Sequence, residues 1–265
     1  MSQQLAQIGT ATTAFGKTER RDAWWVSPLL VALGFGAFIV YTTYRALSNQ
    51  YYEIPPAVGQ AHLLSPFYSP LIRPEWLPAW FSPAIFILWG PGGFRLTCYY
   101  YRKAYYRAYF ADPPACAVGE PRGHRYRGET RLLLFQNLHR FFLYVAILIW
   151  SVLTYDAILA LLWPTADGGH EFGMSVAAIV FWVNIVLLAM YTFGCHSLRH
   201  LVGGKLDCFN CEHFTGKARY KTWRGVSWLN ENHMLWAWLS LVSVSLVDVY
   251  VLLVATGVIT DYRIF

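Results

Sequence analysis

MSVAAIVFWVNIVLLAMYTFGCHSLRHL, residues 174–201, decides the class of fold. It contains one Arg, no Lys and no acidic residue, and it is longer than the about 20 apolar residues that a helix needs to cross a bilayer. Its apolar residues do not alternate at period two, as those of a membrane β-strand do. The stretch therefore predicts a transmembrane helix.

Similar apolar stretches recur along the chain. Hydrophobic residues make up 56% of the 265 residues and charged residues 14%, against about a quarter charged in soluble domains, which excludes an ordinary soluble enzyme. We predict an all-α, single-domain (1–265) integral membrane bundle of five transmembrane helices. The predicted spans are 24–44, 80–101, 132–162, 174–201 and 235–259, with long loops at 102–131 and 202–234. We expect a kink or local unwinding at Gly90-Pro91-Gly92-Gly93.

The net charge of +6 follows the predicted topology. Segments 1–22, 102–131 and 199–224 hold sixteen Lys and Arg residues, whereas the other side holds three, Arg45, Arg73 and Arg263. By the positive-inside rule the N-terminus is cytoplasmic and the C-terminus lies outside. Topology explains the positive charge, so nucleic-acid binding is not needed. The basic loops either dock an acidic cytoplasmic partner or form a solvated surface at the lipid.

Candidate metal ligands gather on the predicted cytoplasmic side. His196 and His200 are four residues apart and share a helix face, and Cys208-x-x-Cys211 has the spacing of two thiolates on one metal. This ligand set, His196, His200, Cys208 and Cys211, suits either a tetrahedral zinc site or a Rieske-type [2Fe–2S] cluster. Substitutes for one of these ligands are His139, His213, His233, Cys98 and Cys195.

A haem b is a further alternative for the same layer. It needs His ligands from two helices at matching depth, and His139 with His196, His200 or His233 meets that need on the inner side.

Polar residues within the predicted spans indicate a quinone site. Ionisable groups inside a span usually face the bundle interior and mark a functional path. We name Arg95, Tyr99, His139 and Arg140 as quinone-binding candidates, because they offer donors to quinone carbonyls, an aromatic wall and a proton path. The competing interpretation is anchoring at the membrane interface, where Tyr and Arg are common. Asp156 and Asp248 receive no role.

Two motifs carry a family resemblance. Gly90-Pro-Gly-Gly-Phe-Arg95-Leu-Thr-Cys98-Tyr-Tyr-Tyr-Arg-Lys, followed by Asp112-Pro-Pro-Ala-Cys116, resembles the actinobacterial membrane anchor (cytochrome b-like) of succinate dehydrogenase/fumarate reductase over nearly the whole chain. The resemblance implies a multi-pass plasma-membrane subunit, not catalytic alone. It implies flavoprotein and iron–sulfur partner subunits on the cytoplasmic side and electron transfer to membrane quinone through a cytoplasmic-side redox centre.

The sequence departs from anchors that hold two haems. The first predicted span has no His, and no outer pair of His exists within the spans, so two haems are not expected and a non-haem centre takes the haem position nearest the partner. The main alternative function is a membrane transporter or structural protein with a zinc-stabilised cytoplasmic loop. A membrane enzyme that uses the metal for catalysis is a second alternative. Copurification with flavin and iron distinguishes the anchor from the transporter or structural protein, whereas the metal enzyme is disfavoured because no carboxylate and base pair lies beside the candidate ligands.

Overall fold

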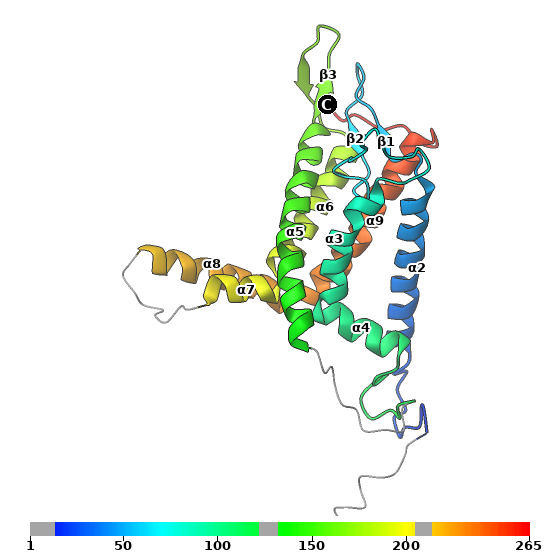
Figure 1. Ribbon diagram of the computed structural model, residues 1–265, viewed down its shortest axis with the longest axis vertical. Helices are drawn as coiled ribbons and strands as arrows, with labels where there is room; N and C mark the ends of the chain where they lie inside the picture. The colour runs from blue at the N-terminus through cyan, green and yellow to red at the C-terminus, as the bar shows by residue number, and fades with distance from the viewer. Residues whose placement is uncertain (1–13, 122–131, 205–213) are drawn as a thin grey trace, which may run out of the picture.

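The computed structural model describes residues 14–121, 132–204 and 214–265. Helices α2, α3, α5, α6 and α9 run along its long axis (Figure 1). The two β-hairpins and the C-terminus lie at one end of the bundle, called the β end below, and α4 and α7 lie at the other, called the α4–α7 end. The elements are α2 Val26–Ser48, β1 Glu53–Ile54, β2 Leu63–Leu64, α3 Ala84–Thr97, α4 Tyr99–Tyr109, α5 Leu132–Leu159, β3 Leu162–Pro164, β4 His170–Phe172, α6 Val176–Phe193, α7 His196–Gly203, α8 Phe214–Glu231 and α9 His233–Ala255.

Four helices of the described chain are long and apolar enough to cross a membrane: α2, residues Asn137–Leu159 of α5, α6 and α9. They correspond to the first, third, fourth and fifth predicted spans, so a helical membrane bundle is confirmed. The small side chains of Ala157 and Ala160 on and after α5, and of Ala177 and Ala178 on α6, are fully buried. Small residues allow membrane helices to approach closely.

Helix α3 is shorter than the predicted second span, 80–101. Its 14 residues extend about 21 Å at 1.5 Å per residue, against about 30 Å of hydrocarbon. The expected unwinding at Gly90–Gly93 is wrong, because α3 stays helical through Pro91. A Cβ at Gly93 would lie 2.2 Å from Phe142 Cε1, and one at Gly90 would lie 2.7 Å from Val145 Cγ1. These glycines let α3 pack closely on α5.

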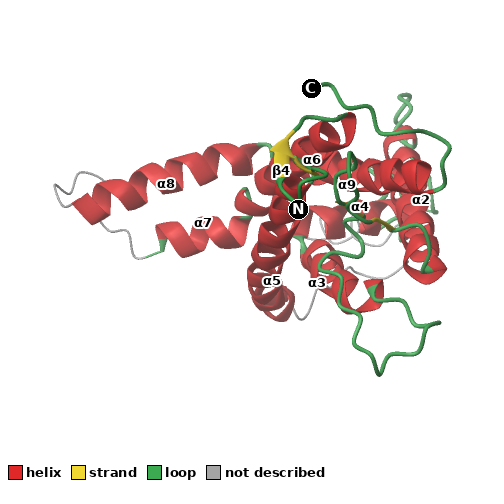
Figure 2. Ribbon diagram, turned by 90° about the horizontal axis from the view of Figure 1, so that it is seen from above, coloured by secondary structure: helices red, strands yellow, loops and turns green. Residues whose placement is uncertain are grey.

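Two cysteines end helices at the α4–α7 end. Cys98 (φ −65°, ψ 130°) separates α3 from α4, and Cys195 (φ −63°, ψ 137°) separates α6 from α7. The predicted spans 80–101 and 174–201 therefore each contain a break, after which the chain turns aside. Helices α7 and α8 project sideways from the bundle as a pair (Figure 2).

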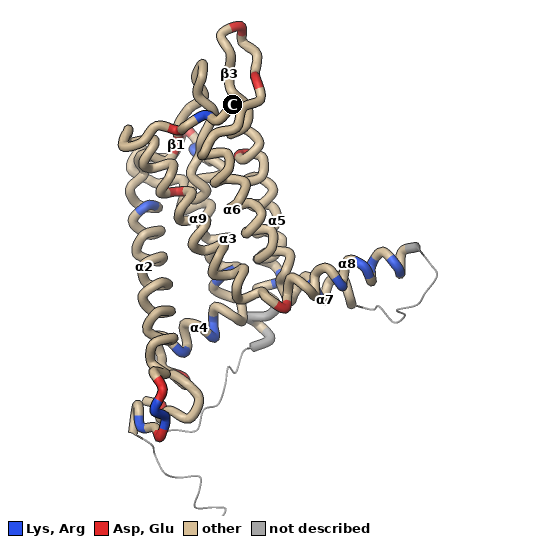
Figure 3. The backbone as a smooth tube through the Cα atoms, turned by 180° about the vertical axis from the view of Figure 1, so that it is seen from behind, with Lys and Arg blue, Asp and Glu red and all other residues tan. Residues whose placement is uncertain are grey.

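Part of each predicted loop is helical. Residues 102–109 belong to α4, and Phe214–Glu231 form α8. Lys and Arg residues follow these two helices and the segment before α2 (Figure 3). Arg45, in the last turn of α2, and Arg263, paired with Glu171 of β4, lie toward the β end. The charge asymmetry seen in the sequence is thus an asymmetry between the two ends of the bundle.

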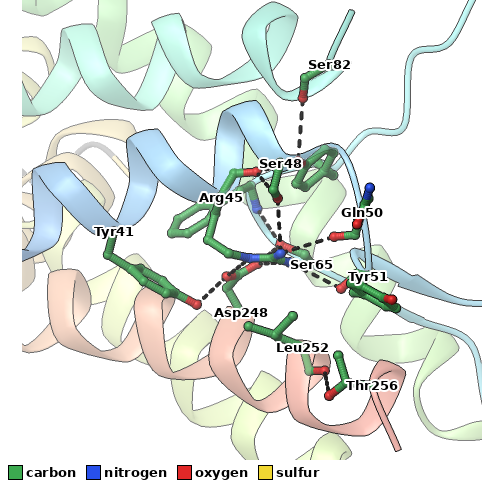
Figure 4. A network of polar contacts seen from close by, with 12 residues as sticks. Tyr41, Arg45, Ser48, Gln50, Tyr51, Ser65, Ser82, Asp248, Leu252 and Thr256 are labelled. Carbon is green, nitrogen blue, oxygen red and sulfur yellow. Dashed lines mark hydrogen bonds and ion pairs between the residues drawn. The ribbon is translucent and has the colours of Figure 1, made fainter. Parts of the chain in front are cut away.

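A buried polar network joins α2 to α9 near the β end. Arg45 Nε donates to Asp248 Oδ2 over 2.7 Å, and Tyr41 Oη donates to the same oxygen over 2.5 Å. Ser65 donates to Asp248 Oδ1. Figure 4 shows these side chains converging on Asp248 from α2 and the loop that follows it. Arg45 and Asp248 are 1% and 0% exposed, so the carboxylate anchors α2 and this loop to the bundle.

Asp156 performs a similar task on α5. It is buried and accepts a hydrogen bond from Ser69. Both aspartates, for which the sequence predicts no role, bind the loop between α2 and α3.

Candidate functional site

Two His–Cys pairs lie buried at the α4–α7 end. His139 of α5 faces Cys195, with 3.1 Å between Nε2 and Sγ. His233, at the start of α9, faces Cys98, with 3.8 Å between Nε2 and Sγ. The four side chains are at most 7% exposed, and each comes from a different part of the bundle. The breaks after α3 and α6 are what turn both thiols inward.

The hydrogen bonds of His139 assign its tautomer. Thr97 Oγ1 donates to Gly93 O over 2.7 Å, so it accepts from His139 Nδ1 at 3.0 Å. His139 Nε2 therefore carries a lone pair toward Cys195. This arrangement, in which Nδ1 donates its hydrogen and Nε2 presents a lone pair, is typical of a metal-binding histidine.

Aromatic rings cover both imidazoles. Phe94 stacks on His139 with ring centroids 4.6 Å apart, and Tyr191 stacks on His233 at 5.0 Å. Arg95 lies behind these rings: its guanidinium carbon is 4.8 Å from the Tyr191 ring centroid, and Nη2 donates to Ser240 Oγ over 3.1 Å. Arg95 thus ties α3 to α9.

A pocket of about 280 Å³ opens beside the two pairs. Its volume is near the lower end of the usual range for ligand pockets. Cys98, His139 and His233 form part of its wall, so the pocket reaches both pairs. The other lining residues are Thr97, Tyr99, Tyr100, Arg102, Asn137, Arg140, His196, Ser197 and His200.

Comparison with known proteins gives the family. Residues 26–257 match the family described as actinobacterial succinate dehydrogenase subunit SdhC. The chain belongs to this family. It is a subunit of a succinate dehydrogenase complex, and membership confirms the multi-pass membrane location and the predicted flavoprotein and iron–sulfur partners.

A solved structure agrees with this assignment. The chain is similar to a chain of the Mycobacterium smegmatis Sdh1 complex in the apo form, with 43% sequence identity, a TM-score of 0.77 and 94% of each chain covered. No curated protein matches the sequence. Membership in the SdhC family replaces the alternative of a transporter or a structural protein.

Three of the four predicted quinone residues of this SdhC-family subunit lie together. Tyr99, His139 and Arg140 line the pocket, whereas Arg95 does not. His233 and Cys98 complete the buried pairs, and the sequence had offered them only as substitute ligands. Their shared depth was the available signal, because both lie at the inner ends of predicted spans.

The predicted metal ligands are only partly described. His196 and His200 share a face of α7, as the spacing predicts, with 3.0 Å between their Nε2 atoms. Cys208 and Cys211 lie outside the described residues. Within residues 14–121, 132–204 and 214–265, no group of three His, Cys, Asp or Glu side chains is arranged to hold one metal ion.

His196 is a candidate proton acceptor of the SdhC-family subunit. Partial burial lowers its pKa below the usual 6.5, and the neighbouring His200 and Arg199 lower it further. The lowered pKa favours the neutral form of His196, which lines the pocket.

Proposed function

We propose that this subunit delivers electrons from its iron–sulfur partner to membrane quinone in the 280 Å³ pocket at the α4–α7 end. The observation that carries the proposal is the wall of this pocket, where Cys98, His139 and His233 of the buried pairs meet Tyr99 and the other polar side chains. The proposed ligands of the electron carrier therefore lie beside the side chains that would donate hydrogen bonds to the quinone.

The proposed topology places the α4–α7 end in the cytoplasm. The Lys and Arg residues along α4 and α8 support it (Figure 3). Helix α3, the second predicted span, is proposed to complete the set of five, because it runs antiparallel to α2 and α5 between the β end and α4 (Figure 1). The N-terminus is then cytoplasmic and the C-terminus outside.

The donor set fits a redox centre of the [2Fe–2S] type. Two thiols and two imidazoles are the ligands of a Rieske-type cluster, which spreads them over two iron atoms. Cys98 lies within electrostatic reach of Cys195, and His139 within reach of His233. His233 Nδ1 is buried without a hydrogen-bond partner. In a Rieske-type cluster the two thiols, Cys98 and Cys195, would hold one iron and the two imidazoles, His139 and His233, the other.

The surroundings of the sulfurs also fit. Backbone N–H groups of Tyr100 and Tyr101 lie beside Cys98, and those of Ser197 and Leu198 lie beside Cys195. Such N–H groups stabilise thiolate ligands and tune the potential of a cluster. A cluster bound here would supply one-electron transfer between the partner and the quinone.

Other ligand sets stay open as proposals. His196, His200, Cys208 and Cys211 form the set that the sequence favours, for an iron–sulfur cluster or a structural zinc. A haem b held by His139 and a second histidine is the remaining alternative. The pocket and the buried pairs favour Cys98, His139, Cys195 and His233.

Quinone reduction consumes two electrons and two protons. Tyr99 and Arg140 are proposed to bind the quinone carbonyls, and Arg95 supports Tyr191 behind them. His139, whose two ring nitrogens are used by Thr97 and the proposed centre, forms part of the pocket wall. His196 and His200 lie in the same pocket wall, and α7 leads from it to the surface. We propose that they pass protons from the cytoplasm to the reduced quinone.

Spectroscopy of the purified complex tests the redox centre. We expect more iron and acid-labile sulfide than the partner subunits account for, and an additional EPR signal in the reduced complex. Zinc in place of the additional iron would contradict an iron–sulfur centre in this subunit, and a Soret band would favour haem b.

Replacing Arg140 tests the quinone pocket. Arg140→Ala is expected to raise the apparent KM for a soluble quinone about tenfold, because a charged hydrogen bond contributes about 1.5–3 kcal/mol and Arg140 is exposed. Succinate oxidation with a dye that takes electrons from the partner subunits should not change. Arg224→Ala, in α8, is the matched control. An unchanged KM for Arg140→Ala would remove this residue from the site.

A further inference from the structure

A second pocket lies at the α4–α7 end, between α2, α4 and α9. Its volume is about 390 Å³, and it also touches the loop around Cys116. Tyr100 is shared with the pocket described above, so α4 separates the two. The second pocket has no part in the proposed electron transfer.

The deep wall of this pocket is apolar. Val31 lies five residues into α2 and Trp238 five residues into α9, which places both about 7.5 Å along their helices from the α4–α7 end. Trp24, Pro28 and Met234 continue the apolar surface. A hydrocarbon chain fits such a wall, whereas a free inorganic anion gains nothing from it.

The rim of the pocket is basic. Lys103 and Arg107 are four residues apart and therefore share one face of α4, and Arg20 lies on the opposite rim. Asp22 neutralises Arg20 through a two-pronged ion pair. Within the described residues, Lys103 and Arg107 have no hydrogen-bond or ion-pair partner. Two like charges at this spacing destabilise a helix slightly, and an anion between them would reverse that effect.

We propose that this pocket binds one anionic phospholipid of the adjacent leaflet, with its phosphate between Lys103 and Arg107 and an acyl chain against Val31 and Trp238. Basic pockets between membrane helices on the cytoplasmic side commonly bind anionic head groups. The pocket lining changes from basic side chains at the rim to apolar side chains deeper in, which matches the charged head group and the acyl chain of one lipid. Binding here does not depend on the quinone proposal.

The test measures lipid bound to the intact complex by native mass spectrometry after partial delipidation. Phosphatidylglycerol and phosphatidylcholine are added back in turn. The wild-type complex is expected to retain one phosphatidylglycerol and to reject phosphatidylcholine. Lys103→Gln with Arg107→Gln should weaken phosphatidylglycerol binding about thirtyfold, from the usual contribution of two basic residues near an anionic surface.

Matched variants separate the site from general charge. Lys217→Gln with Lys221→Gln removes two charges at the same spacing from the exposed part of α8 and should leave binding unchanged. Lys103→Arg with Arg107→Lys should retain the lipid. Val31→Trp keeps the charges and fills the apolar wall, so it should also expel the lipid.

Four results would overturn the proposal. The first is equal binding of phosphatidylcholine, and the second is equal weakening by the α8 control pair. The third is full competition by inorganic phosphate at equal concentration, which would indicate a free-anion site. The fourth is release of the partner subunits by the Lys103 and Arg107 variants with lipid still bound, which would assign these residues to the protein interface.

Discussion

Quinone reduction by the complex is expected to fall at least a hundredfold when Cys195 is replaced by serine. Cys195 is fully buried and its sulfur lies 3.1 Å from His139 Nε2. Loss of an outer-shell partner alone commonly costs ten- to a hundredfold in metal affinity or activity, and a ligand to the centre should matter more. Serine is close to cysteine in size, so the bundle should still assemble.

Two measurements separate loss of the centre from loss of the fold. Succinate oxidation with a dye that bypasses this subunit should stay near the wild-type rate, and the additional EPR signal should disappear. Cys116→Ser changes an exposed cysteine and should leave both unaffected. Cys98→Ser should behave as Cys195→Ser does.

The same assay decides between the ligand sets. If Cys195→Ser keeps the EPR signal and the quinone rate while Cys208→Ser and Cys211→Ser lose them, the centre belongs to the set favoured by the sequence. Loss in the Cys98 and Cys195 variants alone supports the buried pairs.

Hydropathy was sufficient to predict most of the bundle. The predicted spans 24–44, 132–162, 174–201 and 235–259 each overlap a helix able to cross a membrane over most of their length, since long apolar stretches have few alternatives in a bilayer. The breaks at Cys98 and Cys195 were missed, because no proline lies at either point and the predicted spans extend into the more polar residues that follow each cysteine. Gly194, beside the second break, packs closely on α8, because a Cβ there would lie 3.2 Å from Leu229 Cβ.

The glycines of α3 illustrate the same limit. Gly90-Pro91-Gly92-Gly93 is a helix-breaking sequence by local propensity, yet it stays helical because Gly90 and Gly93 lie against α5. Helix propensity is a property of residues 90–93 themselves, whereas the packing that keeps them helical depends on α5.

The residue types of the candidate site and their depth in the bundle were predictable, but which His faces which Cys was not. The sequence places His139 and His233 at the inner ends of their spans, and three of the four predicted quinone residues do line one pocket. Which His faces which Cys depends on how four helices are rotated about their axes. A CxxC motif is visible in the sequence, whereas a pair formed by residues 139 and 195 is not.

Replacing Asp248 by alanine is expected to destabilise the subunit by about 3–5 kcal/mol, because removing one partner of a buried pair leaves an uncompensated charge. Arg45 would keep its hydrogen bonds to the Gln50 and Tyr51 carbonyl oxygens but lose its counter-ion. For a chain of this size the thermal midpoint should fall by about 10 °C. Thermal denaturation of the purified complex, followed by circular dichroism, measures the shift.

Three variants test whether charge compensation is the cause. Asp167→Ala, in an exposed loop at the β end, should change the midpoint little. Arg45→Met with Asp248→Leu removes both charges and should recover most of the loss, because apolar replacement of a whole buried pair is often neutral or stabilising. The thermal midpoint of Asp248→Asn should lie between those of Asp248→Ala and the wild type. If the double variant is as unstable as Asp248→Ala, the network contributes through the hydrogen bonds from Tyr41 and Ser65, and the unpaired charge of Arg45 is not what destabilises the bundle.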